Sequence, residues 1–186
     1  MFDLAYPLED SVEINGEHHA LNLAFDNVLR LIDLLSDKSL SDAIQIEIGL
    51  EMLIGVDLDI SLPEKEEYFY QVFQETIGQG SEDNQMVDID GNPMPEQKEE
   101  KLYDLKQDAA YIYASFMSDY SIDLFEQQGK LHWEKFKALL SGLTDGSKFL
   151  RVIEIRTMEL PKGKGTEKQR SEVIKMKKAY ALKDDE

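Results

Sequence analysis

Cysteine is absent from this chain of 186 residues. Its absence excludes disulfide bonds, thiolate metal sites and cysteine nucleophiles. The chain also lacks an apolar run approaching the roughly 18 residues that a membrane-spanning helix needs. It has no basic N-terminal segment followed by an apolar one, which would mark a signal peptide. We therefore expect no membrane contact and a place in a reducing cytosol.

Basic residues are scarce in the first two thirds of the chain. Residues 1–129 hold 29 Asp and Glu against 6 Lys and Arg, whereas residues 130–186 hold 9 against 14. The two parts carry −23 and +5, which sum to the net charge of −18. Because an acidic body repels phosphates, nucleic-acid binding is disfavoured. Solubility, recruitment of a basic or aggregation-prone partner, and mimicry of DNA all remain open. The basic end either folds back onto the acidic body or stays solvated.

The first regular element predicted by the sequence is a β-hairpin over Ser11–Leu23. Val12 and Ile14 favour a strand, and Asn15-Gly16 tolerates the positive φ angles of a two-residue type I′ turn. An isolated hairpin is only marginally stable in water. We therefore expect it to pack against the helices that follow.

Three helices are predicted next, from apolar residues that recur at helical spacing. The first runs from about residue 24 to 36. The second follows the N-cap candidates Ser39 and Ser41, and its apolar residues lie on so many sides that we expect it to be largely buried. The third begins with a capping box at Ser61–Glu64. Its apolar stripe ends at Gly78 or Gly80.

The second half of the chain also has helical periodicity, and the fold class is therefore mainly α: a helical bundle-like protein with a small N-terminal β-hairpin. We divide the chain into residues 1–80 (hairpin and helices), 81–101 (acidic linker), 102–160 (helices with an aromatic core) and 161–186 (basic helix or tail). The aromatic core is expected to contain Ile112, Phe116, Trp133, Phe136 and Phe149.

Two motifs suggest metal sites but fail on geometry. Counted from Asp88, Gly91 and Glu99 do not fall where an EF-hand loop needs its Gly and its bidentate Glu. Asp88–Asn92 is therefore interpreted as a turn. His18 and His19 are adjacent on a strand, so their side chains point to opposite faces. We expect no metal and no cofactor.

His132 has two interpretations. It could act as a general base oriented by Asp123 or Glu126. No hydroxyl nucleophile or metal motif accompanies His132. A phosphate-binding loop is also missing, since Gly163–Lys168 lacks the spacing of a P-loop. The other interpretation is structural: a ring nitrogen that caps a helix or forms a hydrogen bond within a helical core. The incomplete catalytic set favours the structural role, and we expect no enzyme.

Two aromatic stripes supply the candidate partner-binding residues. Tyr111 and Tyr120 belong to the first stripe, His132 and Trp133 to the second, and Lys137 lies one turn after Trp133. Such stripes usually form core, because aromatic rings bury much area. A small helical protein can also leave some of them half exposed as anchors for a partner helix.

The second half of the chain contains a pattern formed by Asp108, Ala109, Tyr111, Ile112, Tyr113, Phe116, Ile122, Asp123, Leu124, Leu131, His132, Trp133, Lys135, Phe136, Ala138, Leu139, Gly142, Leu143, Phe149 and Arg156. Through these residues the chain resembles the bacteriophage gene-product-15 family, proteins of the tail-gene region in phages and prophages of Gram-positive hosts. At Glu134 the chain departs from this family, since relatives often carry a second aromatic residue after the Trp.

The resemblance implies a tail-assembly role in the host cytoplasm. Proteins of this kind are thought to act as chaperones that keep the tape-measure protein soluble or load tail-tube subunits onto it. The implied partners are therefore the tape-measure protein, the tail-tube protein or another tail assembly chaperone, and a homo-oligomer is also possible. The alternative is a small acidic inhibitor or DNA mimic that acts on a host enzyme.

Overall fold

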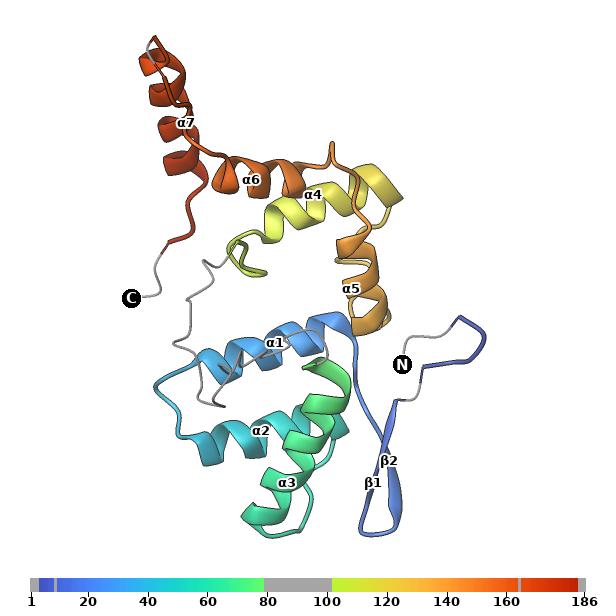
Figure 1. Cartoon of the computed structure of the whole chain (residues 1–186). Helices are drawn as coiled ribbons and strands as arrows, with labels where there is room; N and C mark the ends of the chain where they lie inside the picture. Colours follow the sequence, from blue (N-terminus) through green and yellow to red (C-terminus); the bar gives the residue numbers. More distant parts are fainter. Residues whose placement is uncertain (1–3, 9, 79–101, 164, 184–186) are drawn as a thin grey trace, which may run out of the picture. The chain divides into compact units, whose positions relative to one another are not determined.

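The computed structural model describes residues 4–8, 10–78, 102–163 and 165–183 (Figure 1). Helices account for 55% of the described residues, which also contain one two-stranded sheet. The prediction of a mainly α protein with an N-terminal hairpin is therefore confirmed. The chain divides into two compact units. Unit 1 comprises Met1–Glu96 and Gln128–Phe136, and unit 2 comprises Gln97–Gln127 and Lys137–Glu186.

The hairpin of unit 1 pairs β1 (Ser11–Ile14) with β2 (Glu17–Ala20) in antiparallel register. Asn15 and Gly16 have φ angles of +52° and +83°, as a type I′ turn requires. Val12 and Ile14 are buried, so one face of the hairpin belongs to the core.

The helices of unit 1 are α1 (Phe25–Ser36), α2 (Asp42–Ile54) and α3 (Leu62–Val72), and a π-helical turn, η1 (Phe73–Ile77), extends α3. They pack against one another in the lower part of Figure 1. The capping box at α3 is formed, because the Ser61 N–H donates to the Glu64 carboxylate at 2.9 Å. The expected linker over residues 81–101, including Asp88–Asn92, lies outside the described residues.

Two small or polar residues set the packing of these helices. A Cβ atom at Gly49 of α2 would lie 2.7 Å from Phe69 Cε2, so only glycine permits this approach of α2 to α3. Asn27 is buried in α1, and its amide donates to the Asn22 and Met52 carbonyls at 2.9 and 2.8 Å. The buried amide thereby ties α1 to the C-terminal turn of α2.

A later segment of the chain returns to unit 1. The Phe25 N–H donates to the Leu131 carbonyl at 2.9 Å, and the Trp133 N–H donates to the Leu23 carbonyl at 2.7 Å. The Phe136 ring then stacks on Phe25, with centroids 5.1 Å apart. The helix that carries Phe136, α5 (Trp133–Ser141), thus begins in unit 1 and ends in unit 2.

The aromatic core differs from the expected one, because part of it belongs to unit 1. We predicted one cluster in the second half of the chain, but its members belong to different units. Trp133 and Phe136 belong to unit 1, whereas Ile112, Phe116 and Phe149 belong to unit 2. The physical reason is that backbone hydrogen bonds to the segment before α1 draw this stretch into unit 1, and periodicity alone does not reveal them.

Unit 2 contains α4 (Ala109–Tyr120), the end of α5, α6 (Lys148–Thr157) and α7 (Glu167–Tyr180). Its α4 and α6 are joined by a buried hydrogen bond from the Phe149 N–H to Ser115 Oγ at 3.0 Å. They are also joined by an ion pair in which both Arg156 Nη atoms donate to the Asp108 carboxylate at 2.7 Å. Hydrogen bonding to Asp108 raises the pKa of Arg156, although burial acts in the opposite direction.

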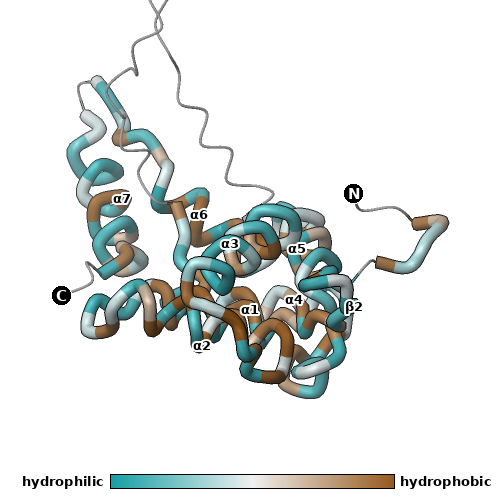
Figure 2. The backbone as a smooth tube through the Cα atoms, turned by 90° about the horizontal axis from the view of Figure 1, so that it is seen from below, coloured by the Kyte–Doolittle hydropathy of each residue, from teal (hydrophilic) through white to brown (hydrophobic). Residues whose placement is uncertain are grey.

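The basic helix α7 packs on α6 of the same unit. Val173 is its only buried residue, and most of the helix is coloured as hydrophilic in Figure 2. Its C-terminal end is held by Arg156 Nε, which donates to the Tyr180 carbonyl at 2.6 Å, and by Gln107, which exchanges two hydrogen bonds with the Lys183 backbone. The expectation of an exposed terminal helix is therefore correct for most of its surface.

Candidate partner-binding surfaces

The five residues predicted as partner contacts do not form one cluster within a unit. His132 and Trp133 belong to unit 1, whereas Tyr111, Tyr120 and Lys137 belong to unit 2. All five are half-buried or buried. Their roles as partner contacts remain predictions.

His132 is the N-cap residue of α5. Its Nδ1 accepts the Glu134 N–H at 3.0 Å, and its Nε2 lies 2.9 Å from a carboxylate oxygen of Asp10. Since Nδ1 accepts, the proton on Nε2 is the one that points at Asp10. The sequence suggested Asp123 or Glu126 as the orienting carboxylate, but Asp10 takes that place. The expected capping role of His132 is confirmed.

Trp133 belongs to the core rather than to an exposed surface. Its side chain is 6% exposed, and its ring stacks on Phe136 with centroids 5.6 Å apart. Trp133 therefore contributes buried area to unit 1, and it lacks the half-exposed ring that an anchor for a partner helix needs.

The three candidates in unit 2 are also held by neighbours. Tyr111 packs edge-on against Tyr180, with Lys148 Nζ 5.6 Å above the Tyr111 ring. The Tyr120 hydroxyl donates to the Leu139 carbonyl at 2.9 Å, and burial raises its pKa. Lys137 is half-buried on α5. Tyr111 and Tyr120 therefore help to join the helices of unit 2.

The structure reveals an exposed apolar surface on α2 that sequence reasoning missed. Ile46, Leu50 and Leu53 are buried, as expected, but Ile44 and Ile48 on the opposite side are 43% and 39% exposed. The prediction that α2 is largely buried is therefore wrong for this side. Among the described residues, neighbouring helices cover one side of α2 and leave Ile44 and Ile48 exposed. Apolar residues occur around the full circumference of this helix, and this pattern could have indicated a second contact.

The α2 surface combines apolar and acidic side chains. Ile44, Ile48 and Met52 are spaced by four residues, so they share one side of the helix. Glu47 and Glu51 are exposed next to them. An apolar stripe beside carboxylates is suited to a helix that carries apolar and basic residues at matching intervals.

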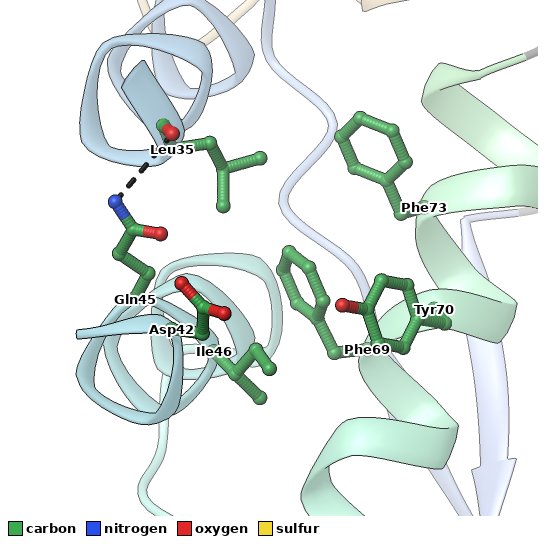
Figure 3. Close-up of a pocket in the computed structure, with 7 residues that line it drawn as sticks. All are labelled: Leu35, Asp42, Gln45, Ile46, Phe69, Tyr70 and Phe73. Carbon is green, nitrogen blue, oxygen red and sulfur yellow. Dashed lines mark hydrogen bonds between the residues drawn. The ribbon is translucent and has the colours of Figure 1, made fainter. Parts of the chain in front are cut away.

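A small pocket lies at the other side of α2, between α1 and α3. Gln45 at its edge donates to the carbonyls of Leu34 and Asp37 at 3.0 and 2.9 Å, which caps the end of α1. The pocket has a volume of about 210 Å³ and is lined by Leu35, Asp42, Gln45, Ile46, Phe69, Tyr70 and Phe73, several of which point into it in Figure 3. Such a space accommodates one apolar side chain rather than a cofactor, since ligand pockets are usually larger than about 300 Å³.

In the part of the chain that the structure describes, no three His, Asp or Glu side chains gather as a metal-binding cluster. His18 and His19 pair with Glu13 and Val12, respectively, so they alternate across the hairpin as predicted. None of the described helices has the length and apolar character needed to cross a membrane.

The comparison with protein families identifies the group of proteins to which the chain belongs. A family model described as Bacteriophage Gp15 protein matches residues 4–182. The chain is a member of this phage family. No curated protein and no solved structure matches it. The Gp15 match extends over both units, and it confirms the resemblance that the second half of the sequence suggested.

Several residues that carried the Gp15 resemblance have structural roles. Asp108 and Arg156 form the ion pair between the start of α4 and α6, and His132 caps α5. These residues therefore stabilise the fold within each unit.

Proposed function

We propose that this Gp15-family protein is a non-enzymatic tail-assembly chaperone that acts in the host cytoplasm. Its partner is the tape-measure protein, a tail-tube subunit or another tail assembly chaperone. Membership of a phage family supports the proposal, and the exposed apolar stripe of α2 is the observation that carries it. That stripe is a surface on which a partner helix can bury apolar area.

Three physical features fit this role. First, a helix that is apolar on its solvent side normally marks a protein-binding surface, because exposed apolar patches are costly to keep. Second, Glu47 and Glu51 would select partner helices that carry basic residues and would repel acidic ones. Third, the net charge of −18 keeps a complex with an aggregation-prone protein soluble.

The decisive experiment is co-expression of the phage's tape-measure protein with and without this chain. We expect the tape-measure protein to remain in the soluble fraction, and to copurify without added nucleotide, only when this chain is present. The double variant Ile44→Ala/Ile48→Ala should lose most of this effect. Leu62→Ala is the matched control, because Leu62 is also 39% exposed in unit 1 but starts a different helix.

Two outcomes would contradict the proposal. One is a tape-measure protein that is equally soluble with and without this chain. The other is a pull-down that recovers a host nuclease or polymerase and releases it on addition of DNA. That result would instead support an acidic inhibitor or DNA mimic.

A further inference from the structure

The turn that follows α4 in unit 2 presents an exposed aromatic ring. Phe125 is 70% exposed, although its ring lies against Tyr113 with centroids 5.4 Å apart. Met117, one helical turn after Tyr113 on α4, is 40% exposed. Tyr113 is half-buried between them. Exposure of so large a ring to water is unfavourable, which indicates a contact that the described residues of unit 2 do not provide.

Hydrogen bonds fix the Phe125 backbone and the Tyr113 hydroxyl without burying the Phe125 ring. One carboxylate oxygen of Asp123 accepts the Phe125 N–H at 2.9 Å, and the other accepts the Tyr113 hydroxyl at 3.2 Å. The same carboxylate thus positions both members of the ring pair. A side chain that is already positioned loses less conformational entropy when a partner binds, so it serves well as an anchor.

The charge next to the rings is negative. Besides burial and the hydrogen bond to Asp123, the charges of Asp123 and Glu126 raise the pKa of Tyr113. Both carboxylates therefore act at the position of the ring pair. An aromatic face combined with carboxylates favours a cation, and an adjacent thioether favours an apolar stem.

We propose that Tyr113, Met117 and Phe125 form an anchor site for a Lys or Arg side chain on an amphipathic helix of a partner protein. The cationic group lies over the Phe125 ring and near Asp123 and Glu126. The aliphatic stem of the Lys or Arg side chain and a neighbouring apolar residue cover Met117. This site shares no residue with the α2 surface and does not depend on the proposed function.

The test uses the full-length chain and a synthetic helical peptide of about 14 Leu and Lys residues that carries a photoreactive leucine. Fluorescence anisotropy should show binding, whereas a peptide with Glu in place of Lys should not bind. Phe125→Ala should raise Kd about tenfold, and Phe125→Trp should retain binding, because Trp has the best face for a cation. Glu126→Gln should weaken binding and reduce its salt dependence.

Controls locate the peptide on the chain. Met176→Ala removes an apolar side chain on α7 that is 38% exposed, close to the 40% of Met117, and should leave Kd within about twofold. Cross-links should map to residues 113–126. Cross-links confined to α2, or an unchanged Kd for Phe125→Ala, would overturn this proposal and leave the tail-assembly proposal intact. Phe125→Ala could instead lose peptide binding while the solubility of the tape-measure protein is independent of this chain. That result would support the anchor site and contradict the tail-assembly proposal.

Discussion

At the scale of single residues, the strongest constraint in unit 2 is the Asp108–Arg156 ion pair. Its two side chains are 1% and 11% exposed, and Arg156 also donates to the carbonyls of Leu102 and Tyr180. One guanidinium therefore joins the segment before α4, α6 and the end of α7. The sequence identified both residues as part of a family pattern, but only the structure shows that they are partners.

Replacement of Arg156 by methionine should destabilise the protein by about 3–5 kcal/mol, because it leaves the buried Asp108 carboxylate without its counter-ion. Methionine keeps much of the apolar stem, so the loss reports mainly on the charge. The free energy of unfolding is to be measured in urea. Arg151→Ala on the exposed side of the same helix is the control and should change it by less than about 0.5 kcal/mol. A loss below about 1 kcal/mol for the Arg156 variant would mean that the ion pair is dispensable.

Gly49 exerts a second constraint at the residue scale, in unit 1. Alanine normally stabilises a helix relative to glycine by about 1 kcal/mol. Here its methyl group would meet Phe69 at 2.7 Å and Leu31 Cδ1 at 3.0 Å. We therefore expect Gly49→Ala to destabilise the protein by about 1–3 kcal/mol, as overpacked cores do.

The second half of the Gly49 test removes the Phe69 ring, which is the nearer of the two side chains that the added methyl group would meet. In a Phe69→Ala background, the same Gly49→Ala change should be neutral or stabilising, because the helix propensity then dominates. A double-mutant cycle in urea gives the coupling between the two positions. If Gly49→Ala has the same effect in both backgrounds, steric contact with Phe69 is not the reason for the glycine.

At the scale of elements, the sequence predicted those structures whose causes are local. The type I′ hairpin follows from Asn15-Gly16, and the start of α3 follows from the Ser61–Glu64 capping box. Helix α1 follows from its apolar spacing and lies within one residue of the expected range, and α2 begins directly after the N-cap candidate Ser41. These signals lie within a few residues of the element that they determine, so they can be recognised without tertiary information.

The features that sequence reasoning missed depend on distant contacts. Trp133 and Phe136 were expected in the core of the second half, but hydrogen bonds to Leu23 and Phe25 place them in unit 1. The exposed side of α2 was missed because its apolar residues looked like core. Phe125 has no periodic neighbours in the sequence, and its 70% exposure is seen only in the structure.

The end of α4 provides a pH-dependent prediction at this scale. The Asp119 carboxylate accepts hydrogen bonds from the Ser118 hydroxyl at 2.7 Å and from the N–H and hydroxyl of Thr144, both at 2.9 Å. These bonds lower its pKa below the ordinary 3.8. A carboxyl group with a depressed pKa in the folded state stabilises it above the unfolded-state pKa. This stabilisation is lost as the pH falls through the folded-state value.

Asp119→Asn should therefore lower Tm near neutral pH, and the difference from wild type should shrink as the pH falls below about 4. Below the pKa of folded Asp119, both proteins carry a neutral side chain at this position, so their Tm values should converge. Circular dichroism melts over a pH series measure the difference directly. A difference that stays the same at every pH of the acid series would show that charge at Asp119 does not contribute.

At the scale of the whole molecule, charge and apolar surface have separate kinetic roles. The net charge of −18 creates a long-range field, whereas Ile44 and Ile48 act only after contact. Long-range attraction affects the rate at which a basic partner arrives, and short-range packing affects how long it stays. The proposed chaperone therefore allows the two contributions to be measured separately.

Association with a soluble, basic segment of the tape-measure protein should slow on the order of tenfold when salt rises from about 50 to about 500 mM, because screening removes the attraction. The dissociation rate should change by less than about threefold over the same range. Ile44→Ala/Ile48→Ala should show the reverse pattern, with faster release and an almost unchanged association rate. Leu62→Ala should resemble wild type in both rates. Biolayer interferometry with the immobilised segment provides both constants. A salt effect found mainly in dissociation would show that the charges act within the contact itself, and the acidic surface would then be part of the binding interface rather than a source of long-range attraction.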